Sequence, residues 1–199
     1  MDTESALNFR PLAIRKAIDC VLAHPDFGPA IDDQRIGVSG GSLGGYTVLT
    51  ALGAKCAATH STDPRIKAGF GLVPFMGISI HEPATSLELW PFEKDLSGLQ
   101  SILTPFLAVY TENDASTPPS TVLKGLSQMS GSTIGIALAG ESHVVSDSAL
   151  PDVYTWELLF FDAWLKGDVR ARDLIYSSVN VSVEGGADDR KTFQSPASI

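Results

Sequence analysis

Four short runs of almost continuously apolar residues alternate along the chain with segments whose apolar residues recur at helical spacing. The runs predict strands at residues 35–40, 65–75, 104–111 and 132–140. The intervening spacing predicts helices at residues 11–23, 43–54, 118–130 and 151–166. A strand that is apolar on both faces is typical of a parallel sheet covered by crossover helices on each side. The alternation therefore predicts an α/β fold with a mostly parallel sheet flanked by helices.

The chain of 199 residues, 44% of them hydrophobic, is long enough to bury the core of one domain. We assign residues 1–176 to this domain. Residues 177–199 are polar and rich in turn-forming residues, and we expect a partly disordered C-terminal tail. Residues 77–100 are longer than an ordinary connection and carry Trp90 and Phe92. This segment fits a lid or pocket wall as well as it fits a plain helix between loops.

The net charge of -9 argues against a nucleic-acid partner, because phosphate binding requires clustered Lys and Arg residues. No apolar run approaches the roughly 20 residues that span a bilayer. The first residues lack the pattern of a signal peptide, which predicts a cytoplasmic protein if Met1 is the natural start. No cysteine or histidine pair has metal-site spacing, and Cys20 and Cys56 are expected to be buried thiols rather than a disulfide.

The stretch RIGVSGGSLGGYTVL, residues 35–49, places Ser42 in a G-x-S-x-G pattern between a predicted strand and a predicted helix. Glycines two residues before and after such a serine allow strand and helix to approach around a strained nucleophile. Backbone N–H groups at a helix N-terminus favour negative charge, so the Leu43 N–H is the predicted oxyanion donor. The alternative is that Ser42 is an ordinary turn residue.

A serine nucleophile needs a base and an orienting carboxylate, which this kind of fold supplies in the order serine, acid, histidine on loops after later strands. Of the four histidines, only His143 follows a strand late enough, directly after residues 132–140. Asp114 follows the preceding strand and is preferred over Glu112, which is still close to the strand end. The remaining histidines receive no catalytic role, although the third can line a pocket: His24, His60 and His81.

Each of these residues also has a plain structural interpretation. Asp114 can cap a helix, and His143 can be a solvated loop residue, just as Ser42 can belong to a tight turn. Their joint occurrence, each just beyond a strand end and in the required order, favours a Ser42–His143–Asp114 triad. Ligands of open α/β sheets bind at the carboxyl ends of the strands.

With these motifs the chain resembles the α/β-hydrolase superfamily, in particular the branch of predicted dienelactone hydrolases related to platelet-activating-factor acetylhydrolases. The resemblance covers roughly residues 9–165, and its stretches are FRPLAIRKAIDCVL, IDDQRIGVSGGSLGGYTVL, DLSGLQSILTPFLAVYTENDASTPP and GESHVV. It implies Ser42 as nucleophile, Asp114 as acid, His143 as base and the Leu43 N–H as one oxyanion donor. Dienelactone hydrolases use a cysteine nucleophile, so the serine here points to ester hydrolysis in general.

The resemblance also implies strands that this chain lacks. In the superfamily several strands precede the nucleophile strand, and a loop among them gives the second oxyanion donor, whereas only residues 1–34 precede the first predicted strand here. We therefore expect strand 35–40 at an edge of the sheet. Such an edge can pair with another copy or a separately encoded part, can be covered by residues 1–10, or can reflect an internal start at Met1.

We expect a serine esterase that cleaves small-molecule carboxylic esters, preferably short-chain or aryl esters, through an acyl-enzyme and without a cofactor. One alternative is a catalytically weak or inactive remnant of the fold that acts in assembly or binding. Another is an acyltransferase or peptidase that uses the same triad.

Overall fold

The computed structural model describes residues 3–56, 62–77, 91–181 and 186–195. In this part of the chain, five strands form one sheet in the order β1-β2-β3-β4-β5. The strands are β1 (Ile36–Gly41), β2 (Ile66–Leu72), β3 (Phe106–Thr111), β4 (Thr133–Leu138) and β5 (Asp189–Gln194). The α-helices are α1 (Thr3–Leu22), α2 (Leu43–Ala51), α3 (Pro119–Gln128), α4 (Leu150–Leu165) and α5 (Val169–Ser177), with short 3-10 helices η1 (Gly28–Ala30) and η2 (Ser97–Ser101).

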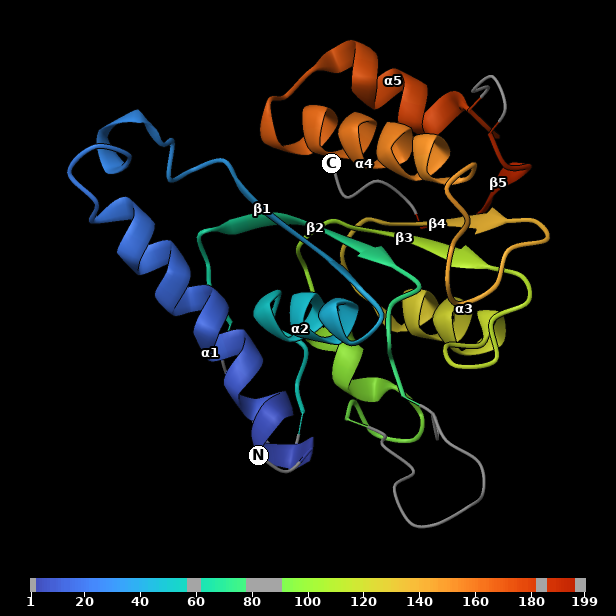
Figure 1. Cartoon of the computed structure of the whole chain (residues 1–199), viewed down its shortest axis with the longest axis horizontal. Coiled ribbons are helices and arrows are strands. Elements are labelled where there is room, and N and C mark those ends of the chain that lie inside the picture. Colours follow the sequence, from blue (N-terminus) through green and yellow to red (C-terminus); the bar gives the residue numbers. More distant parts are fainter. Residues whose placement is uncertain (1–2, 57–61, 78–90, 182–185, 196–199) are drawn as a thin grey trace.

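The sheet is mostly parallel, which confirms the predicted α/β class. Strands β1 to β4 run parallel, and β5 is antiparallel to β4. Helices α2 and α3 lie on one face, and α4 and α5 lie on the other (Figure 1). Every residue of β3 and β4 is buried, because a strand covered on both faces has no solvent-facing side. All four predicted strands are therefore present in this sheet.

Two apolar cores fill the space between sheet and helices. The core on the α2 side includes the fully buried Tyr46, Phe75 and Phe92, and Phe92 stacks on Tyr46 at 5.4 Å between ring centroids. The core on the α4 side is built around Trp156 and Phe160. Phe92 is thus a core residue, whereas Trp90 and the rest of residues 78–90 lie outside the described part of the chain.

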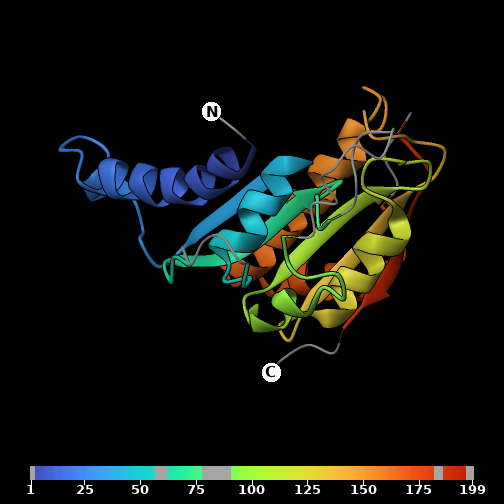
Figure 2. The same cartoon turned by 90° about the horizontal axis from the view of Figure 1, so that it is seen from below.

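Strand β1 lies at the edge of the sheet, as expected for strand 35–40. Its residues are intermediate or exposed rather than buried. Helix α1 packs on α2 and projects past β1 (Figures 1 and 2), so it lies beside the edge without pairing with it. The helix begins eight residues before Pro11, where the sequence predicted its start, and the proline lies inside it.

The C-terminal region differs from the expected polar tail, because residues 189–194 form β5. Asp189 is buried at the start of this strand, where its Oδ2 atom accepts hydrogen bonds from Trp156 Nε1 at 2.6 Å and the Val181 N–H at 3.0 Å. The predicted boundary at residue 176 falls within α5.

Cys20 and Cys56 do not form a disulfide, as expected, and the expectation that both are buried is correct for Cys56 and wrong for Cys20. Cys20 is exposed because α1 contacts the rest of the chain along only part of its surface. None of the described helices is both long and apolar enough to cross a membrane.

Candidate active site

Ser42 occupies the turn between β1 and α2 in a strained backbone conformation. Its φ of 51° and ψ of -117° lie in a region that residues with a side chain rarely adopt. The Ser42 N–H donates to the Leu72 carbonyl at 2.9 Å, and the Ser42 carbonyl accepts from the Phe75 N–H at 2.9 Å. The end of β2 and the loop after it thus hold the serine backbone through both its N–H and its carbonyl, which keeps the strained conformation in place.

Glycines beside Ser42 permit this tight turn, but they are not the pair that the motif predicts. A Cβ atom on Gly40 would lie 2.6 Å from the Gly44 carbonyl carbon, which confirms that strand and helix meet at Gly40. A Cβ atom on Gly44 would meet nothing within 4 Å, so the predicted need for glycine there is wrong. The second close approach is instead at Gly45, where a Cβ atom would lie 2.6 Å from the Cα atom of Pro74.

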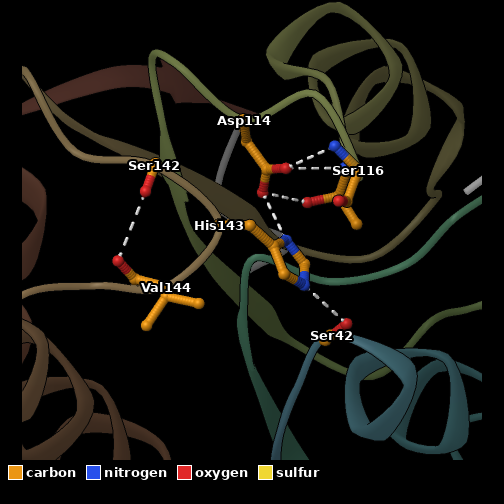
Figure 3. Close-up of polar contacts among 7 residues, drawn as sticks. Ser42, Asp114, Ser116, Ser142, His143 and Val144 are labelled. Carbon is orange, nitrogen blue, oxygen red and sulfur yellow. Dashed lines mark hydrogen bonds and ion pairs between the residues drawn. The ribbon is translucent and has the colours of Figure 1, made fainter.

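His143 reaches Ser42 from the loop after β4. Gly140, the second residue of this loop, has a φ of +74°, a backbone conformation that glycine adopts without strain. The Nε2 atom of His143 lies 2.9 Å from Ser42 Oγ (Figure 3). Glu141 closes the loop, because its carboxylate accepts bonds from the Ser146 N–H at 2.8 Å and the Ser146 hydroxyl at 2.7 Å.

Asp114 lies on the other side of His143, in the loop after β3. Its side chain is buried, and its Oδ2 atom lies 2.8 Å from His143 Nδ1 (Figure 3). The Oδ1 atom accepts bonds from the N–H groups of Ser116 at 2.7 Å and Thr117 at 2.8 Å. Burial raises the pKa of this carboxyl, but hydrogen bonds from Thr117, His143 and Ser116 outweigh burial and hold the pKa below its usual range. Asp114 is therefore held as a carboxylate.

The structure distinguishes these three residues from the other candidates. Glu112 is exposed at the end of β3, whereas Asp114 contacts His143. His24 is exposed beyond α1, where its ring lies 4.6 Å from that of Phe27. His60 and His81 lie outside the described residues. Asp114 is not a helix cap, because α3 is preceded by Pro118 at its N-cap.

Leu43 is the first residue of α2, as expected for an oxyanion donor. The N–H groups in the first turn of a helix have no intrahelical acceptor, and the helix dipole favours a negative charge beside them. An oxyanion formed next to Ser42 would therefore find a hydrogen-bond donor at Leu43.

Sequence reasoning missed Thr117 and Glu141, which hold the loops of Asp114 and His143. The Thr117 hydroxyl donates to Asp114 Oδ2 at 2.6 Å, in addition to the backbone bond to Oδ1. A threonine three residues after an aspartate is a recognisable turn pattern and could have identified Thr117. The Glu141 contacts depend on the path of the loop, and the sequence carries no comparable signal for them.

Comparisons with known proteins assign no family. No protein-family model matches the chain, and no curated protein matches it. Among the described residues, no group of three or more His, Cys, Asp and Glu side chains could hold a metal ion. The chemical interpretation therefore depends on the geometry of the site, in which a hydroxyl, an imidazole and a buried carboxylate form one hydrogen-bonded chain.

Proposed function

We propose that this chain is a serine hydrolase of the α/β-hydrolase type that cleaves carboxylic esters. The observation that carries the proposal is the hydrogen-bonded chain from Ser42 through His143 to Asp114. Its members come from three loops at the carboxyl ends of β1, β3 and β4, where open α/β sheets bind ligands. The strained backbone of Ser42 is a second supporting feature, because it holds the hydroxyl at the end of β1.

The geometry suits a two-step acyl transfer. Ser42 Oγ attacks the ester carbonyl while His143 Nε2 takes the hydroxyl proton, and Asp114 stabilises the resulting imidazolium. The Leu43 N–H donates to the oxyanion, and His143 returns the proton to the leaving alcohol. Water then attacks the acyl-enzyme with His143 again as base, which releases the acid and restores Ser42.

Short-chain and aryl esters are the proposed substrates. Among them, an aryl ester places the smallest demand on oxyanion stabilisation, because a phenolate is a good leaving group. Loss of one oxyanion donor typically lowers turnover by about 10²–10³. With the Leu43 N–H as the one donor assigned, activated esters are the appropriate first substrates.

Hydrolysis of p-nitrophenyl acetate by the wild-type chain and by Ser42→Ala tests the proposal. We expect turnover by the wild type and its loss in the variant, whereas Ser39→Ala removes an exposed β1 hydroxyl and retains activity. Turnover that survives Ser42→Ala, or a folded wild type that hydrolyses no ester, would contradict the proposal. Parallel assays with an added alcohol acceptor and with a p-nitroanilide distinguish acyltransferase and peptidase activity.

A second role, association of two copies through β1, is favoured by the surface along this strand. Three mostly apolar pockets lie along β1. Two of them, of about 300 and 250 Å³, lie between β1 and α1. An edge strand also presents backbone N–H and C=O groups, which the same strand of a second copy can satisfy through an isologous contact.

The oligomeric state tests this second role. Ile31 is 38% exposed and lines the pockets on both faces of the sheet edge. We expect a dimer by light scattering after size-exclusion chromatography, and a monomer for Ile31→Asp. A wild-type monomer at high protein concentration would rule out this association.

A further inference from the structure

A buried threonine hydroxyl lies beside the carboxylate of the proposed triad. Thr117 is 4% exposed, and its Oγ1 atom donates to Asp114 Oδ2 at 2.6 Å. The same oxygen faces His143 Nδ1 at 2.8 Å. Oδ2 therefore has two hydrogen-bond partners, one from the loop of Asp114 and one from the imidazole.

A turn alone does not explain this hydroxyl. The backbone N–H groups of Ser116 and Thr117 close the turn after Asp114 by donating to Oδ1. The Thr117 hydroxyl donates instead to the other oxygen, which these backbone bonds leave open to His143. Removal of the hydroxyl would leave the turn intact and would change only the oxygen that meets the imidazole.

We propose that Thr117 is a positioning residue of the esterase, whose hydroxyl fixes Asp114 Oδ2 toward His143 and shares the negative charge of that oxygen. The inference rests on the proposed function of the site. With donors on both oxygens, the carboxylate cannot rotate about its Cβ–Cγ bond without breaking a bond to Thr117. The imidazole is thereby held with Nε2 directed at Ser42.

The charge on Asp114 supports the same role. Burial raises the pKa of Asp114, and the Thr117 hydroxyl is the strongest of the opposing interactions that lower it. A donor to Oδ2 withdraws charge from the oxygen that stabilises the imidazolium form of His143. Without this donor, Oδ2 would keep more of the negative charge and would bind the imidazolium form of His143 more strongly.

Steady-state hydrolysis of p-nitrophenyl acetate as a function of pH tests the proposal. We expect Thr117→Val, which keeps the shape and backbone bonds, to lower kcat about tenfold with KM unchanged. The acidic limb of kcat/KM should move to higher pH by about half a unit or more. Thr117→Ser keeps the hydroxyl and should restore both values. If Thr117→Val does not fold, Thr117→Ala makes the same comparison.

Thr133→Val is the matched control, because it removes another fully buried hydroxyl at the opposite end of β4 from the His143 loop. We expect wild-type kcat and pH profile from it. A folded Thr117→Val with wild-type kcat and acidic limb would overturn the proposal, as would a Thr117→Ser variant that behaves like Thr117→Val.

A measurement without substrate separates this proposal from the proposed function. We expect the proton between His143 Nδ1 and Asp114 to give a downfield proton NMR resonance in the wild type. This resonance should shift or broaden in Thr117→Val and stay unchanged in Thr133→Val. If this change occurs and the wild type hydrolyses no ester, the esterase proposal fails and the positioning contact stands. If esters are hydrolysed and neither the resonance nor the rate depends on Thr117, the positioning proposal fails alone.

Discussion

Nε2 of His143 lies 2.9 Å from Oγ of Ser42, although the two residues are 101 positions apart in the chain. A base and a nucleophile in contact act as one unit, so their removal has non-additive effects. We expect Ser42→Ala and His143→Ala each to lower kcat for p-nitrophenyl acetate by about 10³ or more, and the double variant to be no slower than either.

The control for His143→Ala is a histidine outside the candidate site. His24 is exposed beyond α1, and His24→Ala should retain wild-type turnover. Losses that multiply in the Ser42→Ala, His143→Ala double variant would show that the two residues act independently, contrary to the proposed mechanism.

Gly40 and Gly44 should respond in opposite ways to the same substitution. A Cβ atom at residue 40 would lie 2.6 Å from backbone at residue 44, whereas one at residue 44 meets nothing within 4 Å. We expect Gly40→Ala to lower the free energy of unfolding by about 1–3 kcal/mol and to reduce turnover. Gly44→Ala should leave stability unchanged or raise it by up to about 1 kcal/mol, because alanine favours a helix.

Urea unfolding of both glycine variants, with esterase assays at the same temperature, checks this contrast. Equal losses of stability in Gly40→Ala and Gly44→Ala would show that the close approach at Gly40 does not limit the turn.

The first four strands could be predicted because burial on both faces leaves a continuous apolar run in the sequence. Strand β5 left no such run, since its residues DRKTFQ alternate between exposed and more buried positions at a sheet edge. Its place in the sheet depends on contacts across the chain, such as those of Asp189 with Trp156 and Lys191 Nζ with the Tyr176 carbonyl at 2.6 Å. Composition alone therefore predicted a polar tail.

The three residues of the candidate site could be predicted because chain order and strand ends restrict where each can stand. Ser42, Asp114 and His143 each follow a strand, and the structure brings them into contact. The two supporting side chains could not be found by that rule, since Thr117 and Glu141 act through loop geometry within their own turns. The predicted start of α1 at Pro11 was wrong. Proline is common in the first turn of a helix, but here it lies inside the helix.

The lowered pKa of Asp114 predicts a pH dependence of stability. Because the folded pKa lies below the unfolded value of about 3.9, this carboxylate stabilises the fold above that pH. The contribution is lost as the pH falls through the folded pKa. We expect Asp114→Asn to lower the free energy of unfolding by about 2 kcal/mol at neutral pH, and the difference from wild type to shrink below about pH 4.

Urea unfolding at several pH values measures this difference. The exposed Asp188 provides the control, since Asp188→Asn should follow the wild-type curve. A gap between wild type and Asp114→Asn that stays constant from neutral pH into acid would contradict the assignment of a stabilising carboxylate.

Asp189 should hold β5 in the sheet through two hydrogen bonds. Its buried Oδ2 atom accepts from the indole N–H of Trp156 and from the Val181 N–H, so removal of the carboxylate leaves two donors without this acceptor. We expect Asp189→Ala to lower the free energy of unfolding by about 2–4 kcal/mol and to change the fluorescence of the fully buried Trp156. Asp188→Ala removes the neighbouring, exposed carboxylate and should change neither quantity. Matching stabilities of the two variants would show that β5 is held by its backbone pairing with β4 alone.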